Sequence, residues 1–213
     1  YDAIEKLALK EKPQVIVAGI TAYPLQVDWA RFAKIAQKVD AYLMADIAHL
    51  AGLVAGGAYP SPVPHAHLVT TTTHKTLRGP RGAMIMVTDK GLKKNPDLAK
   101  KVDQAVFPRL QGGPHMNAIA GIGVALKEAQ TARFKKYAAQ VVKNSEALAK
   151  HLKQHNFHLV AGGSNTHLIL IDLTNKGLLG NTAAEALEAA NIVLNRNAVP
   201  NDPNPPFYPS GIR

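Results

Sequence analysis

Short apolar runs alternate with amphipathic segments along the first half of the chain. Four runs are rich in β-branched and aliphatic residues and have the length of strands: residues 15–18, 42–45, 68–73 and 83–87. Asp28 precedes a stretch of apolar residues at helical spacing, which predicts a capped helix between the first two runs. This alternation predicts an α/β fold, and the run at 42–45 is typical of a sheet buried on both faces.

The second half of the chain carries a long helical pattern followed by shorter elements. Asn95-Pro96 predicts a helix start in cap-then-proline order, and residues 115–155 carry a long apolar stripe. A helical bridge near residue 130 would then join two domains, at 1–130 and 131–213.

Beyond the bridge, the pattern predicts a small domain. We expect strands at 168–172 and 193–195, and a helix opened by a capping box at 182–185.

Composition changes this picture little. The chain has 213 residues, no cysteine and a formal net charge of +10, and no apolar run reaches membrane-spanning length. The lack of cysteine fits a reducing compartment, so we expect a cytoplasmic protein without membrane association. Basic residues are spread over helix faces and only 6% of residues are aromatic, so nucleic-acid binding is not expected. The nine histidines lack metal-ligand spacing, and we predict no metal site.

Lys75 is the most informative residue. It follows the threonine run 70–73 and precedes Gly79-Pro80, which places it just beyond the end of a strand. An amine held there can condense with an aldehyde, and burial would help it to lose its proton. A solvated lysine at a strand end is the alternative interpretation.

Asp46 arrives where the run at 42–45 should end. A carboxylate there needs a partner, and the protonated ring nitrogen of pyridoxal phosphate is a suitable one. A cap of the next helix is the alternative for Asp46, and a loop histidine is the alternative for His49. Together with Lys75, the set suggests a lysine bound to the cofactor aldehyde and an aspartate behind the ring.

Four strings closely resemble the serine hydroxymethyltransferase (glycine hydroxymethyltransferase) family: YLMADIAHLAGLVAGG, YPSPVPHAHLVTTTTHKTLRGPRGA, FPRLQGGPHMNAIAG and NAVPNDPNPPFYPSGIR. The resemblance covers essentially the whole chain, and THKTLRGPRG separates this family from other pyridoxal-phosphate enzymes of the same fold. It implies an aspartate-aminotransferase-like fold (pyridoxal-phosphate fold type I), with part of the large domain and the start of a small α+β C-terminal domain. It also implies transfer of the hydroxymethyl carbon of serine to tetrahydrofolate, giving glycine and methylene-tetrahydrofolate.

The resemblance assigns catalytic roles to residues around Lys75. Lys75 matches the lysine that binds the cofactor aldehyde, and His49 matches the histidine near the cofactor O3′ and the substrate carboxylate. Thr72 and His74 match the polar pair that orders the site. Asp46 matches the aspartate on the pyridine nitrogen.

Further cofactor contacts follow from the same resemblance. Thr21 matches a position, usually serine, whose hydroxyl binds the cofactor ring, and Arg81 matches a turn arginine near the cofactor. The loop that contains Gly112 and Gly113 resembles the one that offers backbone N–H groups to the phosphate, in this family from the neighbouring subunit. We therefore expect a homodimer, or a dimer of dimers. For a lone Gly-Gly pair, an ordinary turn before a helix is the alternative.

Substrate contacts are implied near the end of the sequence. Arg213 matches the arginine that holds the amino-acid carboxylate, a role suited to a planar bidentate donor. Asn197 and the segment Pro205-Pro206-Phe207 match the region that contacts the pterin of the folate. The alternatives are a disordered arginine and a plain proline-rich loop.

Some family features are missing from this sequence. No segment matches the family's upstream stacking histidine, its serine/glycine phosphate loop or its closing helices. His67 stands where aspartate is more usual. We therefore expect a fragment that is inactive alone. Another pyridoxal-phosphate lyase, such as a threonine aldolase, and a non-catalytic piece remain as alternatives, although the string PNDPNPPF favours a folate enzyme.

Overall fold

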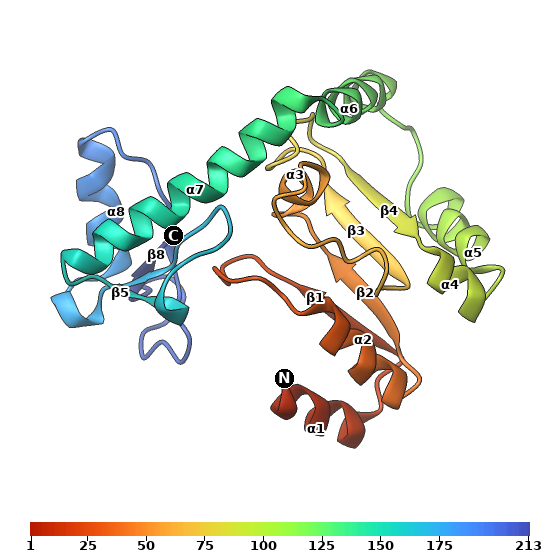
Figure 1. Cartoon of the computed structure of the whole chain (residues 1–213), viewed down its shortest axis with the longest axis horizontal. Helices are drawn as coiled ribbons and strands as arrows, with labels where there is room; N and C mark the ends of the chain where they lie inside the picture. Colours follow the sequence, from red (N-terminus) through yellow and green to blue (C-terminus); the bar gives the residue numbers. More distant parts are fainter. The chain divides into compact units, whose positions relative to one another are not determined.

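The computed structural model describes all residues 1–213, and their contacts group them into two units (Figure 1). Unit 1 comprises Tyr1–Ile20 and Val27–Ala138, and unit 2 comprises Thr21–Gln26 and Ala139–Arg213. The division falls inside a helix that begins at the second residue beyond the predicted boundary of 130/131.

The elements of unit 1 follow the alternating order that the sequence predicts. They are α1 (Asp2–Glu11), β1 (Val15–Gly19), α2 (Trp29–Lys38), β2 (Tyr42–Asp46), α3 (Ala51–Ala55), β3 (Leu68–Thr72), β4 (Ala83–Val87), α4 (Asp89–Lys94), α5 (Leu98–Gln104), the irregular turn η1 (Ala105–Leu110), α6 (Met116–Ala129) and the start of α7 (Ala132–Gln154). The predicted α/β class is confirmed.

The sheet of unit 1 has the strand order β1-β2-β3-β4. The first three strands are parallel, and β4 returns antiparallel to β3 (Figure 1). The register pairs Gly19 with Asp46 and Asp46 with Thr70. The carboxyl ends of parallel strands meet at one edge, so the chain segments that follow β2 and β3 leave the sheet close together.

Only one face of this sheet is covered. Leu43, Ala45 and Val69 are buried on it, and the core of the unit also contains Ile35 and Leu53 from α2 and α3. The opposite face is apolar but open, because Val15 and Val17 of β1 and Ile85 of β4 are exposed. The expectation of a sheet buried on both faces is therefore wrong within these residues.

Helix α2 begins where its cap predicts. The Asp28 carboxylate accepts a hydrogen bond from the Arg31 backbone N–H at 2.8 Å, which satisfies a free donor of the first turn. Ion pairs of Arg31 with Asp2 and of Lys38 with Glu5 hold α1 beside α2.

His67 links the amino-terminal ends of β2 and β3. Its ring Nδ1 accepts a hydrogen bond from the Leu43 backbone N–H at 2.9 Å. The backbone N–H of His67 donates to the Leu43 carbonyl at 2.8 Å. Burial lowers the pKa of His67, Lys90 and Lys94 lower it further, and Asp40 opposes them. The neutral ring therefore acts as the acceptor that joins the two strands.

Unit 2 is built on a second, antiparallel sheet. Besides the rest of α7, its elements are β5 (His158–Leu159), the turn η2 (Val160–Gly162), β6 (Ile171–Asp172), the turn η3 (Thr174–Lys176), α8 (Gly180–Ala189), β7 (Arg196–Asn197) and β8 (Gly211–Ile212). The strand order is β5-β6-β8-β7. Leu173, Ala183 and Ile212 form its buried core.

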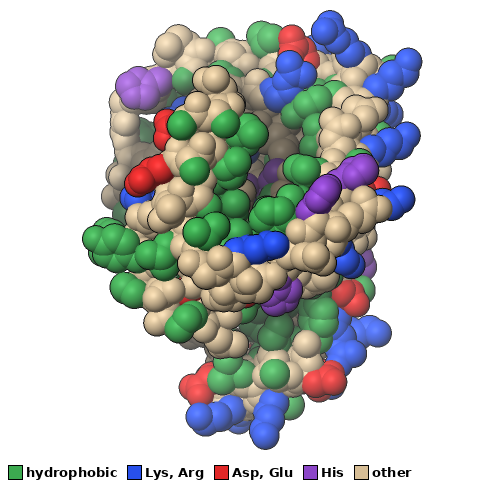
Figure 2. Space-filling model, turned by 90° about the vertical axis from the view of Figure 1, so that its left-hand side faces the viewer, with side chains coloured by type: hydrophobic (Ala, Val, Ile, Leu, Met, Phe, Trp, Pro, Cys, Tyr) green, Lys and Arg blue, Asp and Glu red, His purple; other side chains and the backbone are tan.

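Several hydrophobic side chains of unit 2 remain at the surface. Figure 2 shows hydrophobic atoms reaching the surface among polar ones on the face drawn there. Val193, Phe207 and Tyr208 are among the exposed large side chains of this unit. No helix of the protein is both long enough and apolar enough to cross a membrane.

Two predicted helix starts are wrong in detail. Asn95 ends α4 instead of opening a helix, because the residue before a proline is disfavoured in the helical conformation, and α5 begins only after Asp97. Helix α8 begins at Gly180, whose N–H donates to the Pro209 carbonyl, so Thr182 lies inside it and caps nothing.

The strands predicted in unit 2 are also shorter or displaced. Of residues 168–172, only Ile171–Asp172 forms a strand. The strand predicted at 193–195 lies instead at Arg196–Asn197, and Gly211–Ile212 adds one that the sequence pattern missed. Sheet pairing between such short segments is decided by tertiary contacts, which the local pattern does not carry.

Candidate functional site

Lys75 lies in a tight turn directly after β3. The Arg78 N–H donates to the Lys75 carbonyl at 2.9 Å, and the Gly79 N–H donates to the Thr73 carbonyl at 2.7 Å. The side chain of Thr73 is fully buried and donates to the Pro80 carbonyl at 2.7 Å. The lysine is therefore carried by a turn with a buried anchor, as the β-branched run before Gly79-Pro80 predicts.

A second contact fixes this turn against the loop that follows β2. The Thr76 hydroxyl donates to the His49 carbonyl at 2.8 Å and accepts from the Gly52 N–H at 3.0 Å. A Cβ on Gly52 would lie 2.1 Å from the Thr76 carbonyl oxygen, so only glycine permits this approach. The segments that carry His49 and Lys75 are thus locked together through Thr76.

The amine of Lys75 is connected to Asp46 through a short hydrogen-bonded path. Lys75 Nζ donates to the Thr72 hydroxyl at 3.1 Å, and that hydroxyl donates to the Ala48 carbonyl at 3.3 Å. The Ala48 N–H donates to the Asp46 carboxylate at 2.9 Å. An amine and a carboxylate therefore lie at the same edge of the sheet, on neighbouring strand ends.

His74 and Arg81 flank the lysine turn. Arg81 Nη1 lies 3.3 Å from His74 Nε2. A guanidinium has only donors, so Nε2 is the acceptor and the ring proton is on Nδ1. That Nδ1 is buried and has no hydrogen-bond partner within the chain. It is therefore a free donor beside the lysine.

A cleft of about 710 Å³ opens beside this pair. Its lining includes His74, Arg81, Ile85, Phe107 and Gln111. Gln111 begins the predicted phosphate loop, in which Gly112 and Gly113 are exposed and Gly113 has a φ of 57°. Added Cβ atoms at these two glycines would meet nothing within 4 Å, so the space beside both residues is open.

Arg213 and Thr21, which lie far apart in the sequence, meet in unit 2. Arg213 Nη1 donates to the Thr21 carbonyl at 2.6 Å, and Nη2 donates to the Asn195 side-chain oxygen at 3.0 Å. The Arg213 backbone also exchanges two hydrogen bonds with Asn195. The backbone and the guanidinium of Arg213 are therefore both held in place, contrary to the alternative of a disordered arginine.

The remaining predicted contacts lie on β7 and the loop after it. Asn197 is in β7, and Pro205, Pro206 and Phe207 are exposed in the loop that leads to β8. Each of the predicted site residues thus belongs to one of two groups. The group of unit 1 contains Lys75, Thr72, His74, Asp46, His49, Arg81, Gly112 and Gly113, and that of unit 2 contains Thr21, Arg213, Asn197, Pro205, Pro206 and Phe207.

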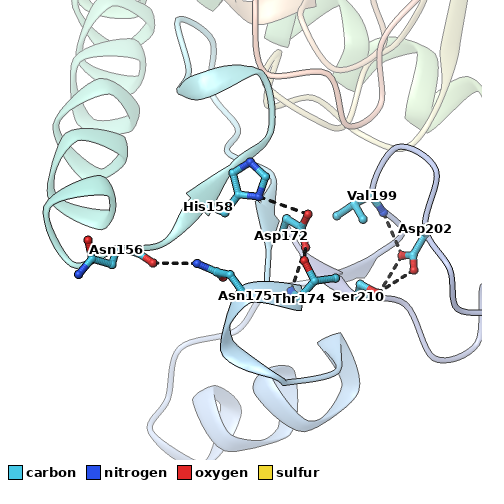
Figure 3. Close-up of polar contacts among 8 residues, drawn as sticks. All are labelled: Asn156, His158, Asp172, Thr174, Asn175, Val199, Asp202 and Ser210. Atoms are coloured by element: carbon cyan, nitrogen blue, oxygen red, sulfur yellow. Dashed lines mark hydrogen bonds and ion pairs between the residues drawn. The ribbon is translucent and has the colours of Figure 1, made fainter.

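Asp202 is a feature of the second group that the sequence interpretation missed. Its carboxylate accepts from the Val199 and Ser210 backbone N–H groups on one oxygen (Figure 3). The other oxygen accepts from the Asn204 N–H and the Ser210 hydroxyl. Burial raises the pKa of Asp202, but these hydrogen bonds outweigh it and lower the pKa to about 2. The Asp-Pro pair at 202–203, a turn signal, could have indicated it.

A second carboxylate in the same unit offers a comparison. Asp172 accepts from the Thr174 N–H at 2.9 Å and from its hydroxyl at 2.7 Å, and His158 lies 3.4 Å away (Figure 3). The two hydrogen bonds are local to the turn after β6, and the contact with His158 reaches only the paired strand β5. Asp172 therefore orders its own turn and does not close a long loop.

Comparison with known proteins gives one consistent result. The family model described as serine hydroxymethyltransferase matches residues 1–213. The chain is 55% identical over 213 residues to serine hydroxymethyltransferase of Legionella pneumophila (strain Lens) and 56% identical to that of Desulfotalea psychrophila. Its identity to the protein of the same name from Zymomonas mobilis is 55%. In each case the match covers 100% of this chain and 48–50% of the relative, so the chain spans about half the length of the curated relatives it matches.

Proposed function

The chain belongs to the serine hydroxymethyltransferase family, and on this premise we propose that the protein containing it transfers the hydroxymethyl carbon of serine to tetrahydrofolate and releases glycine. The family has the pyridoxal-phosphate type I fold, which agrees with the α/β architecture of unit 1. The cofactor of the proposed reaction is pyridoxal 5'-phosphate, and tetrahydrofolate is the co-substrate.

The groups at the carboxyl edge of the first sheet suit this cofactor. Lys75 offers a primary amine to the aldehyde, and Asp46 offers a carboxylate to the protonated ring nitrogen. The Thr70 hydroxyl, on the residue paired with Asp46, is buried and has no hydrogen-bond partner within the chain. Buried hydroxyls are normally satisfied, so a polar ligand at this edge would complete it.

The predicted site residues of unit 1 have different roles in the proposed site. When bound, pyridoxal phosphate supplies an electron sink for the bonds at the α-carbon of the amino acid. Asp46 keeps the ring nitrogen protonated, and the Thr72 hydroxyl orients the Lys75 amine by accepting its hydrogen bond. Arg81 holds His74 in the tautomer whose Nδ1 can donate. His49 would bind the cofactor O3′ or the substrate carboxylate.

The groups of unit 2 suit the two substrates. The Arg213 guanidinium is a planar donor matched to the carboxylate of serine, and its two contacts with Thr21 and Asn195 set its orientation. Asn197 and the exposed side chain of Phe207 offer an amide and an aromatic ring to the pterin.

In unit 1, Gly112 and Gly113 would offer backbone N–H groups to the cofactor phosphate. In the predicted dimer, this phosphate would belong to the cofactor of the neighbouring subunit.

The observation that carries the proposal is the hydrogen-bonded path from Lys75 through Thr72 and Ala48 to Asp46. It is tested by adding pyridoxal phosphate, reducing with borohydride and mapping the labelled peptide. We expect one dominant adduct, on Lys75. Lys75→Arg keeps the charge and should abolish that adduct, whereas Lys94→Arg should leave it unchanged. Labelling spread evenly over the lysines would refute the proposed site.

The activity itself is tested on the protein of full family length. We expect it to form glycine from serine only when tetrahydrofolate is present. Glycine formation that ignores tetrahydrofolate would favour an aldolase instead. The predicted dimer is tested separately by sedimentation, in which an active monomer would contradict it.

A further inference from the structure

The loop between β7 and β8 is closed by a single carboxylate. Asp202 binds the Val199 N–H at 3.1 Å, near the start of the loop, and the Ser210 N–H at 2.9 Å, where the loop ends. It also binds the Asn204 N–H at 3.0 Å and the Ser210 hydroxyl at 2.7 Å. Figure 3 shows Val199 above and Ser210 below the oxygens of this carboxylate. The two ends of the loop are thus joined through one side chain.

The closure depends on the negative charge of Asp202. A carboxylate has only acceptors, and here both oxygens are engaged by donors. Ser210 is 1% exposed, so its N–H and hydroxyl have no water to replace a lost acceptor. Hydrogen bonds to a charged acceptor are stronger than neutral ones, and buried donors left without a partner are costly.

Apart from Asp202, the loop is supported mainly at its end, where Pro209 is buried and its carbonyl accepts from the Gly180 N–H at 2.7 Å, and the Asn204 side chain donates to the Ser210 hydroxyl at 2.8 Å. The residues around Phe207 have less support. Phe207 is 78% exposed, so burial does not fix its position. Its backbone carbonyl accepts from the Asn181 side chain at 3.2 Å, and the Tyr208 N–H donates to the Pro205 carbonyl at 2.9 Å. An exposed aromatic side chain on a loop of this kind keeps one position only if the backbone beneath it is held.

Arg213, by contrast, is held independently of Asp202. Strand β8 pairs with both β6 and β7, and Arg213 makes its own hydrogen bonds to Asn195 and Thr21. Loosening the loop therefore should leave the arginine in place. The predicted contact of Arg213 with serine and that of the Phe207 loop with the pterin can therefore be tested separately.

We propose that Asp202 is a positioning residue for the tetrahydrofolate half of the site, which closes the loop so that Phe207 and its proline neighbours are presented to the pterin. This inference rests on the proposed function. Asp202 touches neither substrate nor the reacting atoms. It acts through the backbone of the loop, and it has no part in binding the amino acid.

Asp202→Asn is the most direct test, because it preserves shape and volume while turning one acceptor oxygen into a donor. Whichever oxygen is replaced, two N–H or O–H donors lose their acceptor. In the protein of full family length, we expect the KM for tetrahydrofolate to rise about tenfold or more. The KM for serine should stay within about twofold.

Asp172→Asn is the matched control, since it makes the same chemical change in the same unit at a carboxylate whose hydrogen bonds stay within one turn and whose other contact is His158 of the paired strand β5. Both KM values should then stay within about twofold of the unsubstituted protein. A second measurement, backbone amide exchange, should show faster exchange at Val199, Asn204 and Ser210 in Asp202→Asn than in Asp172→Asn.

The outcomes separate this inference from the proposed function. An unsubstituted protein without tetrahydrofolate-dependent turnover refutes the proposed function. In an active protein, an Asp202→Asn variant with an unchanged KM for tetrahydrofolate overturns the positioning role. So does an equal rise in both KM values, because a merely destabilised unit 2 would affect both substrates. Unchanged amide exchange in the loop would overturn it as well.

Discussion

Gly19 faces Asp46 across the β1–β2 pair so closely that a side chain at position 19 has no room. A Cβ at position 19 would lie 2.7 Å from the Asp46 carbonyl oxygen and 2.8 Å from the Asp46 Cβ. Real Cβ atoms do not approach so closely, so any side chain at position 19 must displace the aspartate. The placement of the Asp46 carboxylate in the candidate site therefore depends on glycine at position 19 of the neighbouring strand β1.

Gly19→Ala should consequently damage both stability and the site. Because the neighbouring atoms are backbone and Cβ, they cannot move aside cheaply, and we expect a loss of about 1–3 kcal/mol in the free energy of unfolding. The affinity for pyridoxal phosphate should fall as well. Urea unfolding and cofactor titration measure the two effects.

The control for that change is Gly123→Ala. Gly123 lies inside α6, and an added Cβ there would meet nothing within 4 Å. Alanine is the better helix former, so this variant should gain about 0.5–1 kcal/mol and bind the cofactor normally. Equal behaviour of the two alanine variants would show that the close approach at Gly19 has no consequence.

Thr72→Val should slow the reaction of Lys75 with the cofactor aldehyde. The substitution keeps the shape but removes the oxygen that accepts from Lys75 Nζ and donates to the Ala48 carbonyl. We expect the rate of adduct formation to fall about tenfold, the cost of one lost hydrogen bond that orients the amine. Absorbance of the bound cofactor gives this rate. Thr72→Ser retains the hydroxyl and should restore most of it; failure of serine to do so would contradict the orienting role.

His67 should make unit 1 less stable in mild acid. Its folded pKa is lowered by burial and by Lys90 and Lys94, so the unfolded chain binds the proton more readily, near the usual value of about 6.5. The contribution of the neutral ring to stability is therefore complete above about pH 6.5 and is lost as the pH falls toward the lower folded pKa. Protonation would also remove the acceptor of the Leu43 N–H.

Urea midpoints measured between neutral pH and mild acid would reveal this loss. His67→Asn offers an acceptor oxygen that does not titrate, and its midpoint should vary less over the same range. If the two proteins lose stability in parallel, another group is responsible for the acid sensitivity.

Arg213→Lys should weaken the binding of serine selectively. Lysine keeps the positive charge but lacks the planar pair of donors that now contact Thr21 and Asn195 and that would face a carboxylate. We expect the KM for serine to rise about tenfold to a hundredfold, with little change for tetrahydrofolate. Arg196→Lys, at an exposed position of β7, is the control and should change neither KM.

The elements of unit 1 were predictable because their determinants are local. The strand Ala83–Val87 lies where the apolar run predicts, and the Asp28 cap opens α2 as expected. The turn that carries Lys75 could also be predicted from the sequence, because a β-branched run followed by Gly79-Pro80 restricts the backbone by itself. Asp46 is the last residue of β2, so the strand extends one residue beyond the apolar run at 42–45.

Unit 2 was less predictable because distant residues decide it. The pairing of Ile171–Asp172 with Gly211–Ile212 joins segments that carry no strong strand pattern. The contact of Arg213 with Thr21 spans most of the sequence, and the bonds of Asp202 depend on a loop conformation. Resemblance to a family predicted roles for Arg213 and Asn197 in this region, but it gave no reason to consider Asp202.

The low pKa of Asp202, about 2, sets the acid limit of the β7–β8 loop. A carboxylate whose pKa is depressed keeps its contribution above the ordinary aspartate range and loses it only as the pH falls through the depressed value. The closure of the loop by Asp202 is therefore retained from neutral pH into mild acid. A decline in the proposed folate-dependent activity between neutrality and mild acid would then originate in a titrating group other than Asp202, so this loop is a fixed reference in kinetic pH profiles.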